Sequence, residues 1–203
     1  MRYLLLVLSI VLLSACFGGG DVVPQDRYYH LADISGDVAR VSKPFGVIAV
    51  LPLQSDVLHH ERTILYSLQS APLMLNTYYY HQWSNAPGQM IQEHLIAYLR
   101  KAGFARDVIR YGERINIDGQ ISGYIHRFER IVGGDNPMVA VRLELTFAPR
   151  TPATSRSMTR VYDIEQVATD TSMEATVAAF SQALQTIYSR FVADITHEYS
   201  SVR

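Results

Sequence analysis

Two alternating stretches joined by a glycine-rich turn place the strongest constraint on how this chain folds. In the second stretch, apolar residues stand at every other position from Val139 to Phe147. In the first, isoleucines recur at even spacing from Ile115 to Ile125, with two glycines between them. Because side chains of a strand alternate between the faces of a sheet, both stretches predict strands with one buried face. The turn residues Gly133–Pro137 between them predict an antiparallel hairpin.

Four further stretches are typical of strands. The stretch 45–51 is almost entirely apolar and ends at Pro52, which predicts a central strand buried on both faces. The stretches 62–68 and 73–80 predict a second hairpin, and 156–167 extends the first hairpin into a meander.

Two stretches have the three- and four-residue spacing of helices. Apolar residues recur in this way over 90–99, and Gly103 follows as a stop signal. The second stretch, 173–195, has one sharply apolar face and is preceded by the capping pair Thr171 and Glu174. The apolar face predicts core packing, with an oligomer seam as the alternative. The element order predicts an α+β fold: a mixed, mostly antiparallel sheet covered by two main helices, in a single domain.

Composition excludes several classes of function. The chain has 18 Lys and Arg against 19 Asp and Glu, so a net charge of −1 argues against a nucleic-acid partner. A single cysteine excludes an internal disulfide and a thiolate zinc site. Neither GxGxxG nor GxxxxGK[ST] occurs, so we expect no nucleotide and no other non-covalent cofactor.

Catalytic candidates are weak. Ser122 lies one position away from a nucleophile-elbow pattern and within a predicted strand rather than at a strand-to-helix turn. The adjacent His59 and His60 could ligate a metal transiently, but a solvated loop is the favoured interpretation. His94 and His126 are expected to be packing or surface residues. The sequence therefore predicts no catalytic residues, no metal site and no enzyme activity.

An aromatic cluster before the first helix leaves two interpretations open. Tyr78, Tyr79, Tyr80 and Trp83 could fill the junction between strand and helix as core residues. Alternatively, Tyr78, Tyr80 and Trp83 could form a surface for a partner or a lipid, because Tyr and Trp are enriched in interfaces.

The N-terminus has the pattern of a secretory signal. Arg2 is the only charge in the first twenty residues and precedes Tyr3–Leu13, an unbroken run of apolar and small residues. These eleven residues would span only about 16 Å as a helix, well short of the roughly 30 Å hydrocarbon core, so no permanent membrane span is expected. The next residues, Leu13–Cys16, resemble the lipobox of bacterial lipoproteins.

The lipobox resemblance implies that diacylglycerol is attached to the Cys16 sulfur, that the chain is cleaved before Cys16, and that the new amino group is acylated, for example with palmitate. We therefore expect a lipoprotein signal peptide at 1–15, an acylated anchor and flexible leash at 16–26, and one domain at 27–203. Several acyl chains hold a protein on a membrane durably. Residue 17 is Phe rather than the Asp that retains such lipoproteins in the inner membrane, which implies the outer membrane of a Gram-negative bacterium, facing the periplasm.

Six short segments of the chain follow an order and spacing that resemble a known family. They are Tyr28–Leu31, Gly46–Pro52, Arg62–Leu65, Tyr80–Trp83, Pro87 and Leu95–Leu99. Together with the lipobox they look like the ABC-type transport auxiliary lipoprotein family, which includes paraquat-inducible protein C. The similarity runs from about Tyr28 to Ile195.

This resemblance implies a non-enzymatic docking or auxiliary subunit of a mammalian-cell-entry-type (MCE-type) ABC system that moves lipid between membranes. Its partners would be the membrane, through the lipid anchor, and the periplasmic MCE-type protein, with ATP hydrolysis in another subunit. A carrier that binds lipid or lipopeptide in its own cavity is the alternative function. A periplasmic hydrolase is the weakest interpretation.

Overall fold

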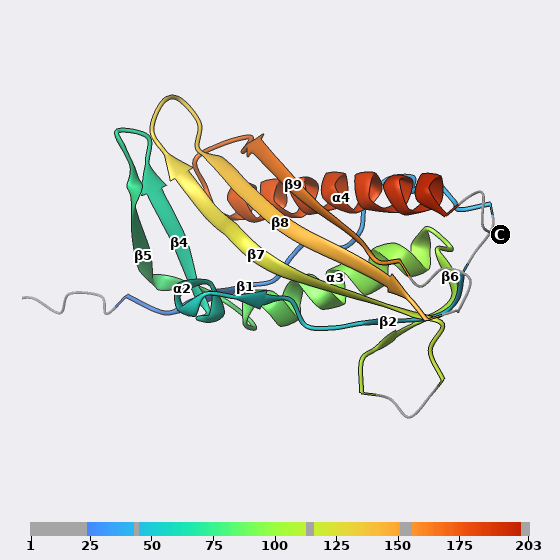
Figure 1. The fold of residues 1–203 in the computed structure, drawn as a ribbon. Coiled ribbons are helices and arrows are strands. Elements are labelled where there is room, and N and C mark those ends of the chain that lie inside the picture. The colour runs from blue at the N-terminus through green and yellow to red at the C-terminus, as the bar shows by residue number, and fades with distance from the viewer. Residues whose placement is uncertain (1–23, 43–44, 113–115, 151–155, 200–203) are drawn as a thin grey trace, which may run out of the picture.

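The computed structural model describes residues 24–42, 45–112, 116–150 and 156–199. The predicted signal peptide and Cys16, with the leash as far as residue 23, lie outside these residues. The described residues form a single α+β domain in which one mixed, curled sheet packs against two long helices, α3 (Pro87–Lys101) and α4 (Met173–Glu198) (Figure 1). The predicted fold class is confirmed.

The central strand of the sheet is β7 (Gly119–Val132). One edge of β7 pairs antiparallel with β8 (Met138–Pro149), which in turn pairs antiparallel with β9 (Met158–Val167), as the predicted meander requires. Three short strands lie one after another along the other edge, all parallel to it: β2 (Phe45–Val50), β3 (Gln54–Ser55) and β4 (Thr63–Leu68). The chain therefore follows β7 from residue 48 to 68 and leaves it twice, between β2 and β3 and between β3 and β4.

Three further elements complete the sheet and its connections. β5 (Ala71–Trp83) pairs antiparallel with β4, which confirms the second predicted hairpin. β1 (Arg27–Tyr29) lies parallel to the end of β5, and β6 (Ala105–Arg110) lies parallel to β2. The antiparallel ladders are the longer ones, and the parallel pairings are short.

Aromatic side chains fill the layer between the sheet and the helices. The ring of Trp83 lies 5.3 Å from that of Phe128 and 5.4 Å from that of Phe180, measured between centroids. On α4, the apolar face is buried against β8 and β9, with Leu184 and Phe191 at 0% exposure. The stripe on this helix is therefore core, as its spacing predicted. Among the described helices, none combines the length and the apolar character needed to cross a bilayer.

Helix starts follow local chemistry. Pro87 occupies the beginning of α3, where a missing N–H costs nothing because that group has no partner within the helix. α4 begins one residue later than its predicted capping pair, since Ser172 is the N-cap and its Oγ accepts from the Ala175 N–H at 3.1 Å.

Candidate docking surface

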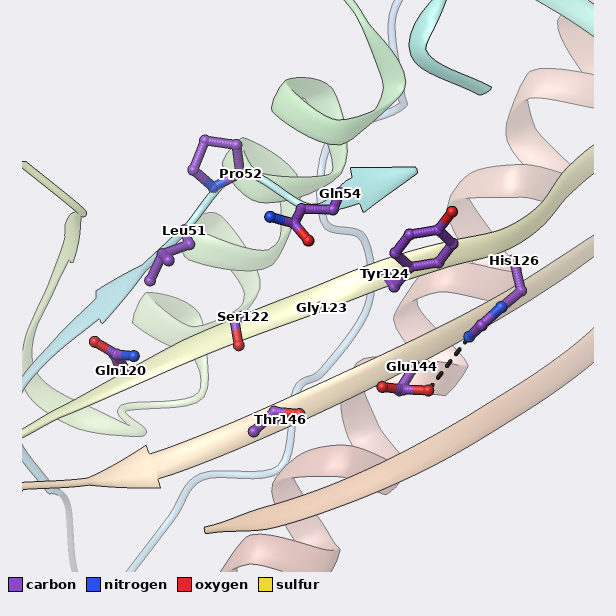
Figure 2. A pocket seen from close by; sticks show the side chains of 10 residues that line it. All are labelled: Leu51, Pro52, Gln54, Gln120, Ser122, Gly123, Tyr124, His126, Glu144 and Thr146. Atoms are coloured by element: carbon purple, nitrogen blue, oxygen red, sulfur yellow. Dashed lines mark hydrogen bonds and ion pairs between the residues drawn. The ribbon is translucent and has the colours of Figure 1, made fainter. Parts of the chain in front are cut away.

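The face of the sheet opposite the helices carries an open pocket of about 530 Å³ over β7 and β8 (Figure 2). Its polar lining comes from three strands, β3, β7 and β8: Gln54, Gln120, Ser122, Tyr124, His126, Glu144 and Thr146. Leu51 and Pro52 form the wall at the point where the chain leaves β7. A pocket with mixed polar and apolar lining suits a contact that forms and separates in water.

The pocket exists because the chain departs from β7 between β2 and β3. The Leu51 N–H still donates to the Ile121 carbonyl of β7 at 2.9 Å, but the Leu53 N–H donates instead to the Gly88 carbonyl of α3 at 3.2 Å. Residue 88 must be glycine, because a Cβ there would overlap the carbonyl oxygen of Leu53. The start of α3 therefore holds this excursion away from the sheet.

Close packing of β7 against β8 forms the pocket floor. A Cβ at Gly123 would lie 2.6 Å from the Glu144 carbonyl oxygen and 2.8 Å from the Leu145 Cδ2. Any larger residue would push the two strands apart at the pocket. The glycines that interrupt the alternating pattern of this strand thus mark close approach.

His126 and Glu144 form a long contact that is exposed to solvent. His126 Nε2 lies 3.4 Å from Glu144 Oε2, and the two side chains are 39% and 41% exposed. The His126 ring also packs beside that of Tyr124, with centroids 4.9 Å apart. Exposed pairs of this kind contribute little to stability, which leaves both side chains available to a partner.

Ser122 lies in the pocket without the geometry of a nucleophile. The histidine in the same pocket, His126, is four residues further along the same strand, about 13 Å away at strand spacing, and it pairs with Glu144. A general base must come within about 3.2 Å of the hydroxyl. This arrangement does not support acyl-transfer chemistry at Ser122.

Two histidines outside the pocket, His59 and His94, are buried, and the prediction for His59 is wrong. His59 does not lie in a solvated loop: it is 4% exposed within α2 (Val57–His60), and its Nδ1 lies 2.7 Å from Asp56 Oδ1. The short helix forms because Asp56 caps it, and it packs against α3. His60 beside it is exposed. Among the described residues, no three His, Cys, Asp or Glu side chains converge as metal ligands would.

His94 is a packing residue, as predicted. Its Nε2 lies 3.0 Å from the Ala32 carbonyl oxygen, which ties α3 to the segment after β1. Burial lowers the pKa of His94 below the ordinary histidine value, and the hydrogen bond to Ala32 partly offsets this shift.

The aromatic cluster divides between core and surface. Trp83 is 1% exposed, so its assignment to a partner or lipid surface is wrong: the ring fills the junction between sheet and helices. Tyr78 is half-buried, with its ring 4.5 Å from that of Tyr66 and its hydroxyl accepting from Arg130 at 3.1 Å. Tyr79 and Tyr80 face outward at 85% and 46% exposure. Shifts of register between β4 and β5 break the strict alternation, so spacing did not separate these residues.

Sequence reasoning missed both the pocket and an exposed apolar stretch on β5. Leu73 is fully exposed and Met74 is 52% exposed, although both were expected in a simple hairpin strand. The sequence signal for the exposed stretch was the absence of charged residues: from Thr63 to Gln92 the chain has no Asp, Glu, Lys or Arg.

Comparison with known proteins gives one family-model match and several solved structures with a similar fold. The family model described as "ABC-type transport auxiliary lipoprotein component" matches residues 29–192. Protein XCC0632 from Xanthomonas campestris has a similar structure, with a TM-score of 0.69 at 18% identity over 87% of this chain and 100% of that one. An uncharacterised protein of known structure gives 0.61 at 14% identity, over 86% and 98%. No curated protein matches by sequence.

Proposed function

The chain belongs to the ABC-type transport auxiliary lipoprotein components, and we propose that it is an outer-membrane lipoprotein that docks an MCE-type ABC system for lipid transport between membranes. In this proposal the chain is not an enzyme. The acyl chains on Cys16 hold it on the membrane, and the folded domain receives the periplasmic MCE-type protein.

The observation that carries this proposal is the contrast between the two faces of the sheet. One face is sealed by α3 and α4, with Phe128 of β7 and Leu143 of β8 at 0–1% exposure beneath them. The other face bears the open pocket, lined by side chains from β3, β7 and β8 and by Leu51 and Pro52. A domain built this way offers a shaped surface to another protein.

Physical cost explains why such a subunit is useful. Each lipid methylene exposed to water costs about 0.8 kcal/mol, so lipid must cross the periplasm inside a conduit that is held at both membranes. A tethered domain can hold one end of the conduit without taking part in ATP hydrolysis.

A carrier that binds lipid in its own cavity is the second candidate. It would need room for acyl chains, whereas aromatic rings fill the space between sheet and helices at centroid distances of 4.4 to 5.4 Å. Native mass spectrometry of the gently purified protein separates the two functions. The docking function predicts no stoichiometric non-covalent lipid, and a carrier predicts one or more bound lipids per chain.

The docking function is tested by placing the same large cation on each face of the molecule. Ser122→Arg fills the pocket, and Ser189→Arg, at an exposed position of α4, is the matched control. The full-length chain is co-expressed with the MCE-type protein of its own bacterium, and the complex is measured by co-purification.

We expect Ser122→Arg to reduce the recovered complex at least tenfold and Ser189→Arg to leave it unchanged, with both variants melting near the parent temperature. Failure of the parent chain to bind the MCE-type protein would overturn the docking role itself. Binding that survives Ser122→Arg would remove the pocket from the docking surface.

A further inference from the structure

β5, which lies at the edge of the sheet, carries several apolar side chains that are exposed to solvent. Five of them are large and exposed, and we call them the β5 edge patch: Leu73 at 100%, Met74 at 52%, Leu75 at 37%, Tyr79 at 85% and Tyr80 at 46%. β1 pairs with β5 only from His81 to Trp83. Within the described part of the chain, the edge from Ala71 to Tyr80 therefore has no neighbouring strand.

The patch lacks the charges that normally protect a sheet edge. Soluble proteins blunt long edges with charges, lysine above all, because an open apolar edge invites aggregation. Here no Asp, Glu, Lys or Arg occurs from Thr63 to Gln92. An uncharged apolar patch of this kind indicates a surface that is covered when the protein works.

A bulge contains Leu73 and Met74, the two patch residues nearest the β4–β5 turn. Ser67 pairs with Leu75, but the next pair along the ladder joins Leu68 to Ala71. Residues 72–74 therefore bulge out of the ladder. Pro72 within the bulge has no backbone N–H. One polar group fewer must therefore be dehydrated when this backbone moves into an apolar environment.

The patch lies at the end of the molecule where the N-terminal chain emerges. β1 runs parallel to β5 with Arg27 opposite His81, so the residues before Arg27 approach from the side of Tyr80 and the patch. Figure 1 shows the first described residues and the β4–β5 hairpin at the same end, opposite β6 and the end of α4. From Cys16 to Pro24 the chain advances eight residues, which span at most about 28 Å. Over this distance, a Cys16 anchored in a bilayer and the β5 edge patch can reach the same membrane.

We propose that the β5 edge patch contacts the same lipid bilayer that holds the acylated Cys16, an inference that rests on the proposed lipid anchor. Leu73 and Met74 enter the boundary between headgroups and acyl chains, and Tyr79 and Tyr80 lie at headgroup level, where tyrosine is favoured. The contact is apolar, because the patch carries no cation. It fixes how the docking pocket is oriented toward the periplasm.

The only native cysteine is the predicted acylation site, so a new cysteine in the mature lipoprotein is the single free thiol. Leu73→Cys places it in the patch. Val161→Cys is the control, because Val161 is 49% exposed on β9 and pairs with Glu144, which in turn pairs with Tyr124. This control position lies far from the patch along the sheet. Tyr124 is seven residues, about 23 Å, along β7 from Ile131, and Ile131 pairs with Ser67 beside the patch.

Each full-length variant is extracted from membranes, labelled with a polarity-sensitive fluorophore and reconstituted into phosphatidylethanolamine vesicles. Quenching is measured with bilayer-embedded nitroxide lipids and with aqueous iodide. We expect the label at position 73 to shift to shorter wavelength and to be quenched at least threefold more by nitroxide lipid than the label at 161, equally at 50 and 500 mM salt.

Other outcomes contradict the inference in distinguishable ways. A chain that stays on the vesicles but whose label at 73 is quenched by iodide as strongly as that at 161 overturns membrane contact alone. A label at 73 shielded from both quenchers assigns the patch to a protein partner or a second copy. A chain that leaves the vesicles altogether overturns the lipid anchor and, with it, the patch proposal.

Discussion

Trp83 and Tyr79 lie four residues apart on β5 and have opposite roles. Trp83 is 1% exposed and packs between Phe128 of β7 and Phe180 of α4. Tyr79 is 85% exposed. The sequence alone did not show which of these two aromatic residues is buried, and only their tertiary contacts distinguish them.

Truncation of these two residues should have very different costs. Trp83→Ala removes a ring from the filled core and should lower the free energy of unfolding by about 3–5 kcal/mol. Tyr79→Ala removes no core contact and should change it by less than about 0.5 kcal/mol. Urea unfolding of both variants measures the difference. Equal effects would refute the placement of Trp83 in the core.

His94 should make stability depend on pH. Burial holds its pKa in the folded state below the ordinary histidine value of about 6.5. The unfolded chain therefore takes up a proton first as the pH falls, and the stability that neutral His94 contributes is lost below about pH 6.5. His81, whose pKa burial also lowers, acts in the same direction.

The measurement compares the free energy of unfolding of the parent and of His94→Gln at pH 7 and pH 5, and the variant corrects for carboxylates that begin to titrate near pH 5. We expect the parent to lose more stability over this interval than the variant loses. An identical pH dependence would show that His94 does not titrate as its burial requires.

At the scale of elements, α3 positions the proposed docking pocket through one glycine. A Cβ at Gly88 would overlap the Leu53 carbonyl oxygen, and the Gly88 carbonyl accepts from the Leu53 N–H. Gly88→Ala should push the 51–53 excursion from its place, lower stability by about 1–3 kcal/mol and weaken binding of the MCE-type protein. Gln89→Ala, at the exposed neighbouring position, is the control and should change neither. Unaltered binding and stability in Gly88→Ala would contradict this coupling.

Periodicity predicted the elements that bury one face. Both hairpins and both long helices follow from alternation or from three- and four-residue spacing, because burial on one face leaves a repeat in the sequence. β6, with the sequence ARDVIR, was not predicted, since three of its six residues are charged. β1 has only three residues and depends on pairing with β5, and β3 has only two.

The arrangement along β7 could not be predicted for a different reason. Three short strands share one edge of β7 because α3 holds the 51–53 segment away from it and the 56–62 segment folds into α2, which packs against α3. The separation into three strands depends on tertiary contacts, which leave no periodic pattern of apolar residues in the sequence. The pocket forms where the chain leaves β7 between two of these strands, so no sequence pattern predicted it. The β5 edge patch, in contrast, does have a sequence signal, because it lies in a stretch without charged residues.

At the scale of the whole molecule, the account joins three regions with separate tasks. The N-terminal cysteine is proposed to anchor the chain, the β5 edge patch to rest on the bilayer, and the opposite open face of the sheet to receive a periplasmic protein. The sealed layer between the sheet and the helices makes the domain a rigid support for both contacts.

The acylated cysteine is the claim on which this division depends. Intact mass spectrometry of the protein extracted from bacterial membranes tests it most directly. The account predicts a chain that begins at Cys16 and carries a diacylglycerol and a further acyl chain, and predicts that Cys16→Ser appears in the soluble fraction or unprocessed, without these masses. A membrane-extracted chain that begins elsewhere, or that carries no acyl group, would contradict it.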